Sequence, residues 1–199
     1  MIGCINKRER REGKVKSMRV KEKDIILKNN LKCKIRTPES KDSKIFIDHL
    51  MKILSETDFM LTYPEEFTTT LEEEGKMLEE TADSENKAMI TAFINGIVAG
   101  NVSVYPIRDR EKVSHRASIG IGVVQKFWGL EIAKHLITMA LDTARKMGYS
   151  QIELGVFKDN HKAIKLYEEF AFVKCGEVPN AFKLKDGTYR DEILMYRNL

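Results

Sequence analysis

The sequence has few of the residues that mark several large classes of protein. Its three cysteines, Cys4, Cys33 and Cys175, are odd in number and widely spaced, so neither a disulfide framework nor a zinc site is expected. Its four histidines form no HExxH pattern, and no GxSxG motif marks a nucleophilic serine. No apolar run approaches the roughly 20 residues of a membrane span. We therefore expect no metal site, no membrane partner, and reduced thiols of the kind found in the cytoplasm.

Length and composition are typical of one ordinary globular domain. The chain has 199 residues, of which 42% are hydrophobic and only four are proline. Its N-terminus is charged with no apolar core behind it, so a secretory signal is not expected.

The net charge of +4 comes from the N-terminus alone. Residues 1–30 hold ten Lys or Arg and four Asp or Glu, a net +6, which leaves 24 minus 26, or −2, for residues 31–199. Such a basic segment serves either as an arm for nucleic acid or an acidic membrane, or as a solvated tail. No aromatic residues interleave its charges, which favours the solvated tail. We assign residues 1–23 to a flexible tail and 24–199 to a folded domain.

Periodicity along residues 24–199 predicts a mixed α/β sheet rather than a doubly wound one. Asn95-Gly96, between two β-rich runs, is a strong hairpin signal. Ser40 or Ser43 is the expected cap of a first helix whose apolar positions are Ile47, Leu50, Met51 and Leu54. The remaining predicted elements are a short strand pair around Asn29-Asn30, a helix opening at Thr70, a strand over 112–124 with Val113 and His115 on its apolar face, a helix over 129–147, a strand over 149–157, a helix over 160–170 and a closing strand pair with Asp186-Gly187 at its turn.

The stretch "QKFWGLEIAKHLI", residues 125–137, resembles a phosphate-binding turn that runs into a helix. A tight turn at Gly129 leaves the first amides of the helix unpaired, and the helix dipole adds partial positive charge there. Glu131 stands where a glycine would let the backbone approach a phosphate. From these residues alone, the stretch is either an anion cradle or an amphipathic helix that happens to begin with a glycine.

Two motifs in order resemble the GNAT family of N-acetyltransferases. The family pattern Q/R-x-x-G-x-G/A falls on residues 128–133, with Trp128 in the first slot, Glu131 in place of glycine and Ala133 in the last slot. The pattern N-x-x-A-x-x-L-Y-x-x-x-G-F falls on residues 160–172 and is matched at five of its six positions, with alanine at 171 in place of glycine. The resemblance covers residues 31–199 and is most specific over 119–178.

The resemblance implies a GNAT-type acyl-CoA N-acyltransferase fold, with a mixed, mostly antiparallel sheet flanked by helices. It further implies direct acetyl transfer from acetyl-CoA, as cosubstrate, to a primary amine. Lys126 and Lys134 could offset the charge of Glu131 or bind coenzyme phosphates. The implied cofactor-binding residues are Ile121, Gly122 and Val123 on a strand end, the turn residues Trp128, Gly129, Leu130, Glu131, Ile132, Ala133 and Lys134, and Asn160.

Several roles stay open from the sequence. Asn160 is either a helix cap alone or also a coenzyme contact, and Tyr167 is either packing or the general acid that protonates the departing thiolate. His115 and Glu153 are weak candidates for the general base. In bacterial acetylases of ribosomal-protein N-termini a glutamate stands five residues before the asparagine, where this chain has Gly155.

The acceptor and the oligomeric state are also open. Tyr63, Glu65, Glu66 and Phe67 in "LTYPEEFTTT" either line a cleft that attracts a cationic amine or form a solvated loop with Pro64 at a turn. A non-catalytic acyl-CoA-binding module of the same fold is the alternative function. The resemblance is also compatible with a homodimer.

Overall fold

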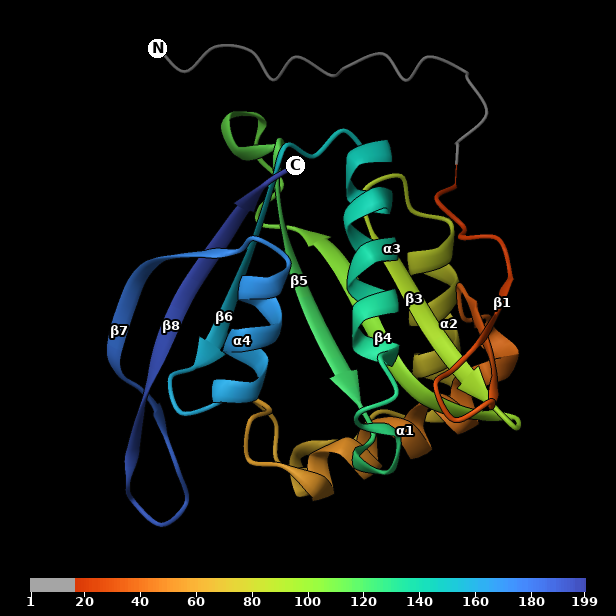
Figure 1. Cartoon of the computed structure of the whole chain (residues 1–199), viewed down its shortest axis with the longest axis horizontal. Helices are drawn as coiled ribbons and strands as arrows, with labels where there is room; N and C mark the ends of the chain where they lie inside the picture. The colour runs from red at the N-terminus through yellow and green to blue at the C-terminus, as the bar shows by residue number, and fades with distance from the viewer. Residues whose placement is uncertain (1–16) are drawn as a thin grey trace, which may run out of the picture.

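The computed structural model describes residues 17–199 (Figure 1). The first sixteen residues of the predicted basic tail lie outside the described part of the chain. The main elements follow in the order β1 (Lys23–Ile26), β2 (Lys32–Arg36), α1 (Ser43–Glu56), α2 (Leu71–Ala82), β3 (Ala88–Ile94), β4 (Ile97–Pro106), β5 (Arg116–Val123), α3 (Ile132–Lys146), β6 (Gln151–Phe157), α4 (His161–Glu169), β7 (Val173–Lys183) and β8 (Tyr189–Asn198).

The eight strands of residues 17–199 form one mixed sheet, as predicted. Their order is β1-β2-β3-β4-β5-β6-β8-β7, and β5 and β6 are the one parallel pair. Helix α3 is the crossover between these two strands, because parallel neighbours cannot be joined by a tight hairpin. The β3–β4 hairpin turns at Asn95 and Gly96, whose φ angles of 50° and 78° are the positive values that a two-residue hairpin requires.

Helices cover both faces of the sheet. Figure 1 shows α3 and α4 in front of it and α1 and α2 on the other side. Side chains of a strand alternate between the two faces of the sheet, and both faces of β3 are covered by helices. As a result β3 is buried along its whole length. Phe46 of α1 and Leu78 of α2 pack on Met89 and Phe93 of β3 in the smaller apolar cluster. The predicted stripe of α3 is confirmed as part of the larger cluster: Ile132, Leu136, Ile137, Ala140, Leu141 and Ala144 are all buried.

The predicted apolar face of α1 is correct for Leu54, which is buried, and for Leu50, which packs on the smaller apolar cluster, but it is wrong for Met51. Its buried residues are Phe46, His49, Ile53 and Leu54, whereas Met51 is 37% exposed. The reason is that His49 occupies the inner face and bonds the Asn101 side chain of β4 through Nε2 at 2.9 Å. A prediction of the buried face from apolar spacing alone leaves out this polar residue.

The predicted serine caps of α1 are also wrong. The N-cap is Asp42, but its carboxylate does not cap this helix. It accepts hydrogen bonds from Arg36 at 2.6 and 2.9 Å and from the Glu39 amide at 2.8 Å. Burial raises the pKa of Asp42, but these hydrogen bonds outweigh burial and hold the pKa below its ordinary value. By contrast, Thr70 caps α2 in a reciprocal arrangement with Glu73, as its sequence predicts.

Part of the predicted tail contacts the folded domain. The Arg19 guanidinium lies 2.7 Å from Glu79 and 2.8 Å from Asp83, at the end of α2. The amide of Val20 donates to the Thr37 hydroxyl at 2.9 Å. The folded part of the chain therefore includes residues on the N-terminal side of the predicted boundary.

Helix α4 ends through a left-handed residue that is not glycine. Ala171 has a φ of 57°, and the Phe172 amide behind it donates to the Tyr167 carbonyl at 3.1 Å. Gly148 ends α3 in the same way, with a φ of 86° and a Tyr149 amide bond to Ala144 at 3.1 Å. The family pattern has glycine at position 171 because only glycine adopts this backbone without steric cost.

We expect Ala171→Gly to stabilise the protein. The left-handed backbone costs an alanine about 1–2 kcal/mol, and the greater freedom of glycine in the unfolded chain takes back roughly 0.5–1 kcal/mol. The net gain of about 0.5–1 kcal/mol should raise the melting temperature by about 1–4 °C in calorimetry or circular dichroism. Gly148→Ala is the matched control and should lower it. A fall in melting temperature for Ala171→Gly would contradict this account.

Candidate active site

The site is built on the separation of β5 from β6. Their parallel pairing covers only three registers and ends at Ser118 opposite Glu153. Beyond that point β5 stays paired with β4 and β6 with β8, so the two strands diverge, as Figure 1 shows. Arg116 of β5, in the first paired register, holds both carboxylate oxygens of Glu153 of β6, in the last paired register.

Main-chain groups of β5 face the resulting gap. The Val124 amide bonds Ala99 of β4, and the Ile107 amide bonds the Arg116 carbonyl. Bonded pairs alternate in antiparallel strands, so even-numbered residues of β5 exchange hydrogen bonds with β4. Ile119, Ile121 and Val123 therefore turn their main-chain groups towards β6, where no strand pairs with them in the described chain.

Two of the predicted strand-end residues already contact other parts of the protein. The Trp128 indole donates through Nε1 to the Val123 carbonyl at 2.7 Å, which leaves Val123 only its amide for the gap. Gly122 faces β4 with its main chain, and a Cβ at this position would lie 2.7 Å from Ile53 Cδ1 of α1. The absence of a side chain at Gly122 thus lets α1 pack closely on the sheet.

The predicted anion cradle corresponds to the turn between β5 and α3, which leaves several backbone amides free. Gly129 has a φ of 78°, and nothing lies within 4 Å of the position a Cβ would take. The first amide with a helical acceptor is that of His135, which donates to Glu131 at 3.2 Å. Among residues 17–199, the six amides from Gly129 to Lys134 have no acceptor. Six free amides at the positive end of a fifteen-residue helix fit a diphosphate.

Glu131 is the N-cap of α3 and has the left-handed φ of 65°. This backbone explains the glycine of the family pattern, and α3 begins at Ile132 rather than at the predicted Gly129. The Glu131 carboxylate lies 3.0 Å from Nζ of Lys28, in the β1–β2 turn. Lys28 thereby offsets the negative charge beside the cradle, a partner that the sequence analysis missed because it is 103 positions away.

Lysine contacts join the turn to α4. Lys162 at the start of α4 lies over the Trp128 ring, 5.0 Å from its centroid, and Lys134 of α3 lies 2.6 Å from Glu169 at the end of α4. Lys126 lies 5.6 Å from the centroid of the adjacent Phe127 ring. Of the two lysines predicted to offset Glu131 or bind phosphates, Lys134 is therefore already paired with another carboxylate.

Helix α4 carries the predicted asparagine and tyrosine. The Asn160 side chain caps the helix by accepting from the Ala163 amide at 3.2 Å. Tyr167 is 7% exposed and packs edge-on against Phe172. Its hydroxyl bonds no residue of 17–199 and is not among the fully buried polar atoms, so it reaches a space that solvent can enter. Burial raises the pKa of Tyr167 to about 12, so the phenol is neutral at physiological pH and can donate a proton.

The two predicted bases are poorly placed. His115 precedes β5, because residues Glu111–Val113 form a 3-10 turn instead of the predicted strand. It lies at the paired end of β5, about 20 Å of extended chain from Ile121. Glu153 accepts from Arg116 and Gln151, and Arg116 above all holds its pKa below the ordinary value. Neither group is a suitable proton acceptor for an amine in the gap.

The predicted acidic loop meets the tip of the β7–β8 hairpin. Glu65 pairs with Lys185, and the Tyr63 hydroxyl accepts from the Lys185 amide at 3.1 Å. Glu66 caps the turn Pro64–Glu66 by accepting from the Tyr63 amide at 2.7 Å. Both carboxylates are thus engaged within the protein, and Pro64 has the turn role that the alternative interpretation gave it.

An aromatic group on the same side connects this loop to the sheet. The Phe157 and Phe182 rings stack with centroids 3.8 Å apart, and Phe59 packs edge-on against Phe157 at 5.7 Å. Arg190 lies over Phe59, 5.6 Å from its centroid. The sequence analysis missed this group because its members come from four separate segments.

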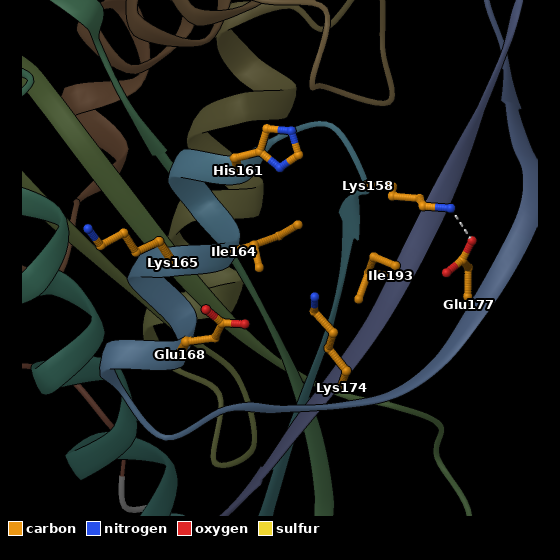
Figure 2. Close-up of a pocket in the computed structure, with 8 residues that line it drawn as sticks. All are labelled: Lys158, His161, Ile164, Lys165, Glu168, Lys174, Glu177 and Ile193. Atoms are coloured by element: carbon orange, nitrogen blue, oxygen red, sulfur yellow. Dashed lines mark hydrogen bonds and ion pairs between the residues drawn. The ribbon is translucent and has the colours of Figure 1, made fainter.

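A hollow lies between α4 and strands β7 and β8 (Figure 2). Lys158, His161, Lys165 and Lys174 line it together with Glu168 and Glu177. Lys158 is neutralised by Glu177 at 2.6 Å and Asp191 at 3.0 Å. None of the predicted site residues lines this hollow, and neither does any residue of β5 or β6.

A mixed sheet with one diverging parallel pair, and free amides in the glycine turn that opens the crossover helix, is typical of coenzyme A-dependent acyltransferases. Residues 50–172 match the acetyltransferase (GNAT) family, and the chain belongs to that family. It is therefore an N-acetyltransferase whose cosubstrate is acetyl-CoA, as the resemblance implied. Among residues 17–199, no helix has the length and apolar character needed to cross a membrane.

One relative is similar to this chain in sequence, and two solved structures are similar to it in fold. The chain is 30% identical to an L-amino acid N-acetyltransferase from Escherichia coli K12 over 120 residues, which is 60% of this chain and 73% of the relative. A GNAT acetyltransferase from Streptococcus pneumoniae superposes with a TM-score of 0.80 at 27% identity, over 84% of this chain and 99% of that one. A Salmonella typhimurium protein solved with its cofactor acetyl-CoA has the same fold, with a TM-score of 0.74 at 18% identity over 84% and 94% of the two chains.

We expect Lys28→Ala to weaken acetyl-CoA binding about two- to fivefold, because it leaves the Glu131 charge unopposed beside the cradle. Isothermal titration calorimetry in low salt measures the change, and added salt should reduce it. In a Glu131→Gly background the same Lys28→Ala change should have no effect. Equal losses in both backgrounds would show that Lys28 acts independently of Glu131.

Proposed function

We propose that this protein transfers the acetyl group of acetyl-CoA to a primary amine, of a small molecule or a protein, by direct transfer in a ternary complex. The six free amides of the turn, beside a gap edged by unpaired main chain, carry this proposal. Bound acetyl-CoA supplies an activated thioester. The chain supplies the binding, the orientation and the proton transfers.

The cradle would hold the diphosphate through main-chain amides of Gly129, Leu130, Glu131, Ile132, Ala133 and Lys134. Because only backbone is used, Ile132 can at the same time be a buried core residue, as it is here. Ile121 and the Val123 amide would then bind the pantetheine arm along the gap. Trp128 would position this end of the strand through its bond to the Val123 carbonyl.

Helix α4 would supply the general acid. Tyr167 is protonated, packed against Phe172 and free to donate through its hydroxyl. Asn160 anchors the start of the same helix, so its capping role and a contact with the coenzyme arm are compatible. Tyr167 would give its proton to the thiolate as the carbon–sulfur bond breaks.

We expect Tyr167→Phe to reduce kcat about 100-fold or more while the Kd for acetyl-CoA stays within about twofold of wild type. The reason is that phenylalanine keeps the buried ring and removes only the proton. Steady-state kinetics and calorimetry provide the two readouts. Since the pKa of Tyr167 is about 12, the wild-type rate should show no alkaline loss from this group below about pH 11. An unchanged kcat would remove Tyr167 from the mechanism.

The acceptor follows from a screen of amines monitored by free thiol release. The E. coli relative acts on L-amino acids by its name, so amino acids belong in the panel beside polyamines, aminoglycosides and lysine peptides. We expect amine-dependent thiol release with at least one class. Acetyl-CoA binding without release by any amine would favour the alternative, a non-catalytic acyl-CoA-binding module.

The cytoplasmic location and the homodimer stay predictions, and so does a solvated role for the basic tail. Deleting residues 1–16 and measuring salt-dependent binding to DNA or RNA would test whether the tail binds nucleic acid.

A further inference from the structure

On the side of the gap from which the acceptor would enter, glycines border the gap on both strands. Ser118 and Glu153 are the last paired residues of β5 and β6, and Gly120 and Gly155 follow two positions later on the same face. This is the α1 face, because the neighbouring Gly122 approaches Ile53 of α1. Nothing lies within 4 Å of a Cβ built on Gly120. The gap therefore opens here towards an incoming molecule.

A carboxylate from a third strand occupies the space above Gly155. Phe157 of β6 pairs with Glu192 of β8, which places Glu192 diagonally next to Gly155 on the same face. A Cβ built on Gly155 would overlap the Glu192 carboxylate and lie 2.7 Å from its Cδ. The glycine thus leaves room for an acid that enters from β8.

Within the described part of the chain, Glu192 differs from Arg116 and Arg190 on this face because its side chain has no hydrogen-bond or ion-pair partner. Arg116 is paired with Glu153, and Arg190 with Asp159 at 3.4 Å. The Glu192 side chain makes no hydrogen bond or ion pair with any residue of 17–199. Its carboxylate lies directly beside the backbone of Gly155. An unpaired carboxylate at the entrance of the gap suits an ammonium group.

We infer that Glu192 is the general base of the acetyl transfer, an assignment that rests on the proposed function. Glu192 takes one proton from the acceptor ammonium, directly or through one water, and leaves a neutral amine. The amine lone pair forms the carbon–nitrogen bond, and the carbon–sulfur electrons go to sulfur. Tyr167, on the α4 side, protonates the thiolate and recovers its proton from the acylated nitrogen through water. Glu192 releases its proton to solvent.

The division of labour follows from the two faces of the sheet. The cradle and Tyr167 belong to α3 and α4, and Glu192 belongs to the face that packs on α1. The thioester would approach through the gap from one face and the amine from the other. The base and the acid would then act on opposite sides of the reacting carbon, which avoids direct proton exchange between them.

The test replaces and then relocates the carboxylate. Glu192→Gln should lower kcat/KM for the best acceptor about 30- to 100-fold at pH 7 and leave the Kd for acetyl-CoA within about twofold. Its residual rate should rise about tenfold per pH unit below the pKa of the amine, because only spontaneously neutral acceptor reacts. Glu168→Gln, on the α4 side, is the matched control and should keep the wild-type rate.

Two further variants separate a base from a structural role. Gly155→Ala keeps the acid but displaces it, and should cost about tenfold with little change in melting temperature. The double variant Gly155→Glu/Glu192→Gly moves the carboxylate onto β6 and should recover at least about a tenth of the wild-type rate. A wild-type rate and pH profile for Glu192→Gln would overturn the assignment of Glu192 alone. No thiol release by the wild-type protein would overturn the proposed function and this role together.

Discussion

The divergence of β5 from β6 is the constraint on which the site depends. Each strand is held along its outer edge, β5 by β4 to Val123 and β6 by β8 to Phe157, so neither can close the gap. Arg116 and Glu153 fix where the divergence starts. Among residues 17–199, no strand pairs with the main-chain groups of Ile119 and Ile121 along the gap, and unpaired polar groups of this kind require water or a ligand. A flat, fully paired sheet would bury the same residues and provide no place for a pantetheine arm.

The departures from the family motifs change side chains without changing the backbone. Glu131 and Ala171 replace glycines, and both have the left-handed φ that glycine favours, at 65° and 57°. The cradle amides and the end of α4 therefore keep the geometry that a glycine would give. The difference is steric cost at Ala171 and an added charge at Glu131, which Lys28 offsets. A residue that departs from the motif is thus weaker evidence against the motif's function than a backbone that cannot adopt the required conformation.

Local signals predicted most of the fold and the glycine turn before α3, whereas non-local contacts set the rest of the candidate site. The Asn95-Gly96 turn, the Thr70 cap and the α3 stripe each depend on residues a few positions apart, so the sequence contains the whole signal. The Lys28–Glu131 pair and the position of Glu192 above Gly155 depend on the order of strands in the sheet. The inner face of α1 was predicted only in part for a related reason, since it includes His49, whose ring bonds Asn101 of β4.

Charge at the acceptor side belongs to one carboxylate rather than to the acidic loop. Glu65 is neutralised by Lys185, and Glu66 is used as a cap, so neither offers a free charge to a cationic amine. Loop and hairpin instead stabilise each other, and the Phe157–Phe182 stack fixes the hairpin against β6. Unpaired charge interacts most strongly where water is partly excluded, and Glu192 is half-buried at the start of the gap. Attraction of an ammonium group and removal of its proton would therefore fall to the same side chain, which couples acceptor binding to the chemical step.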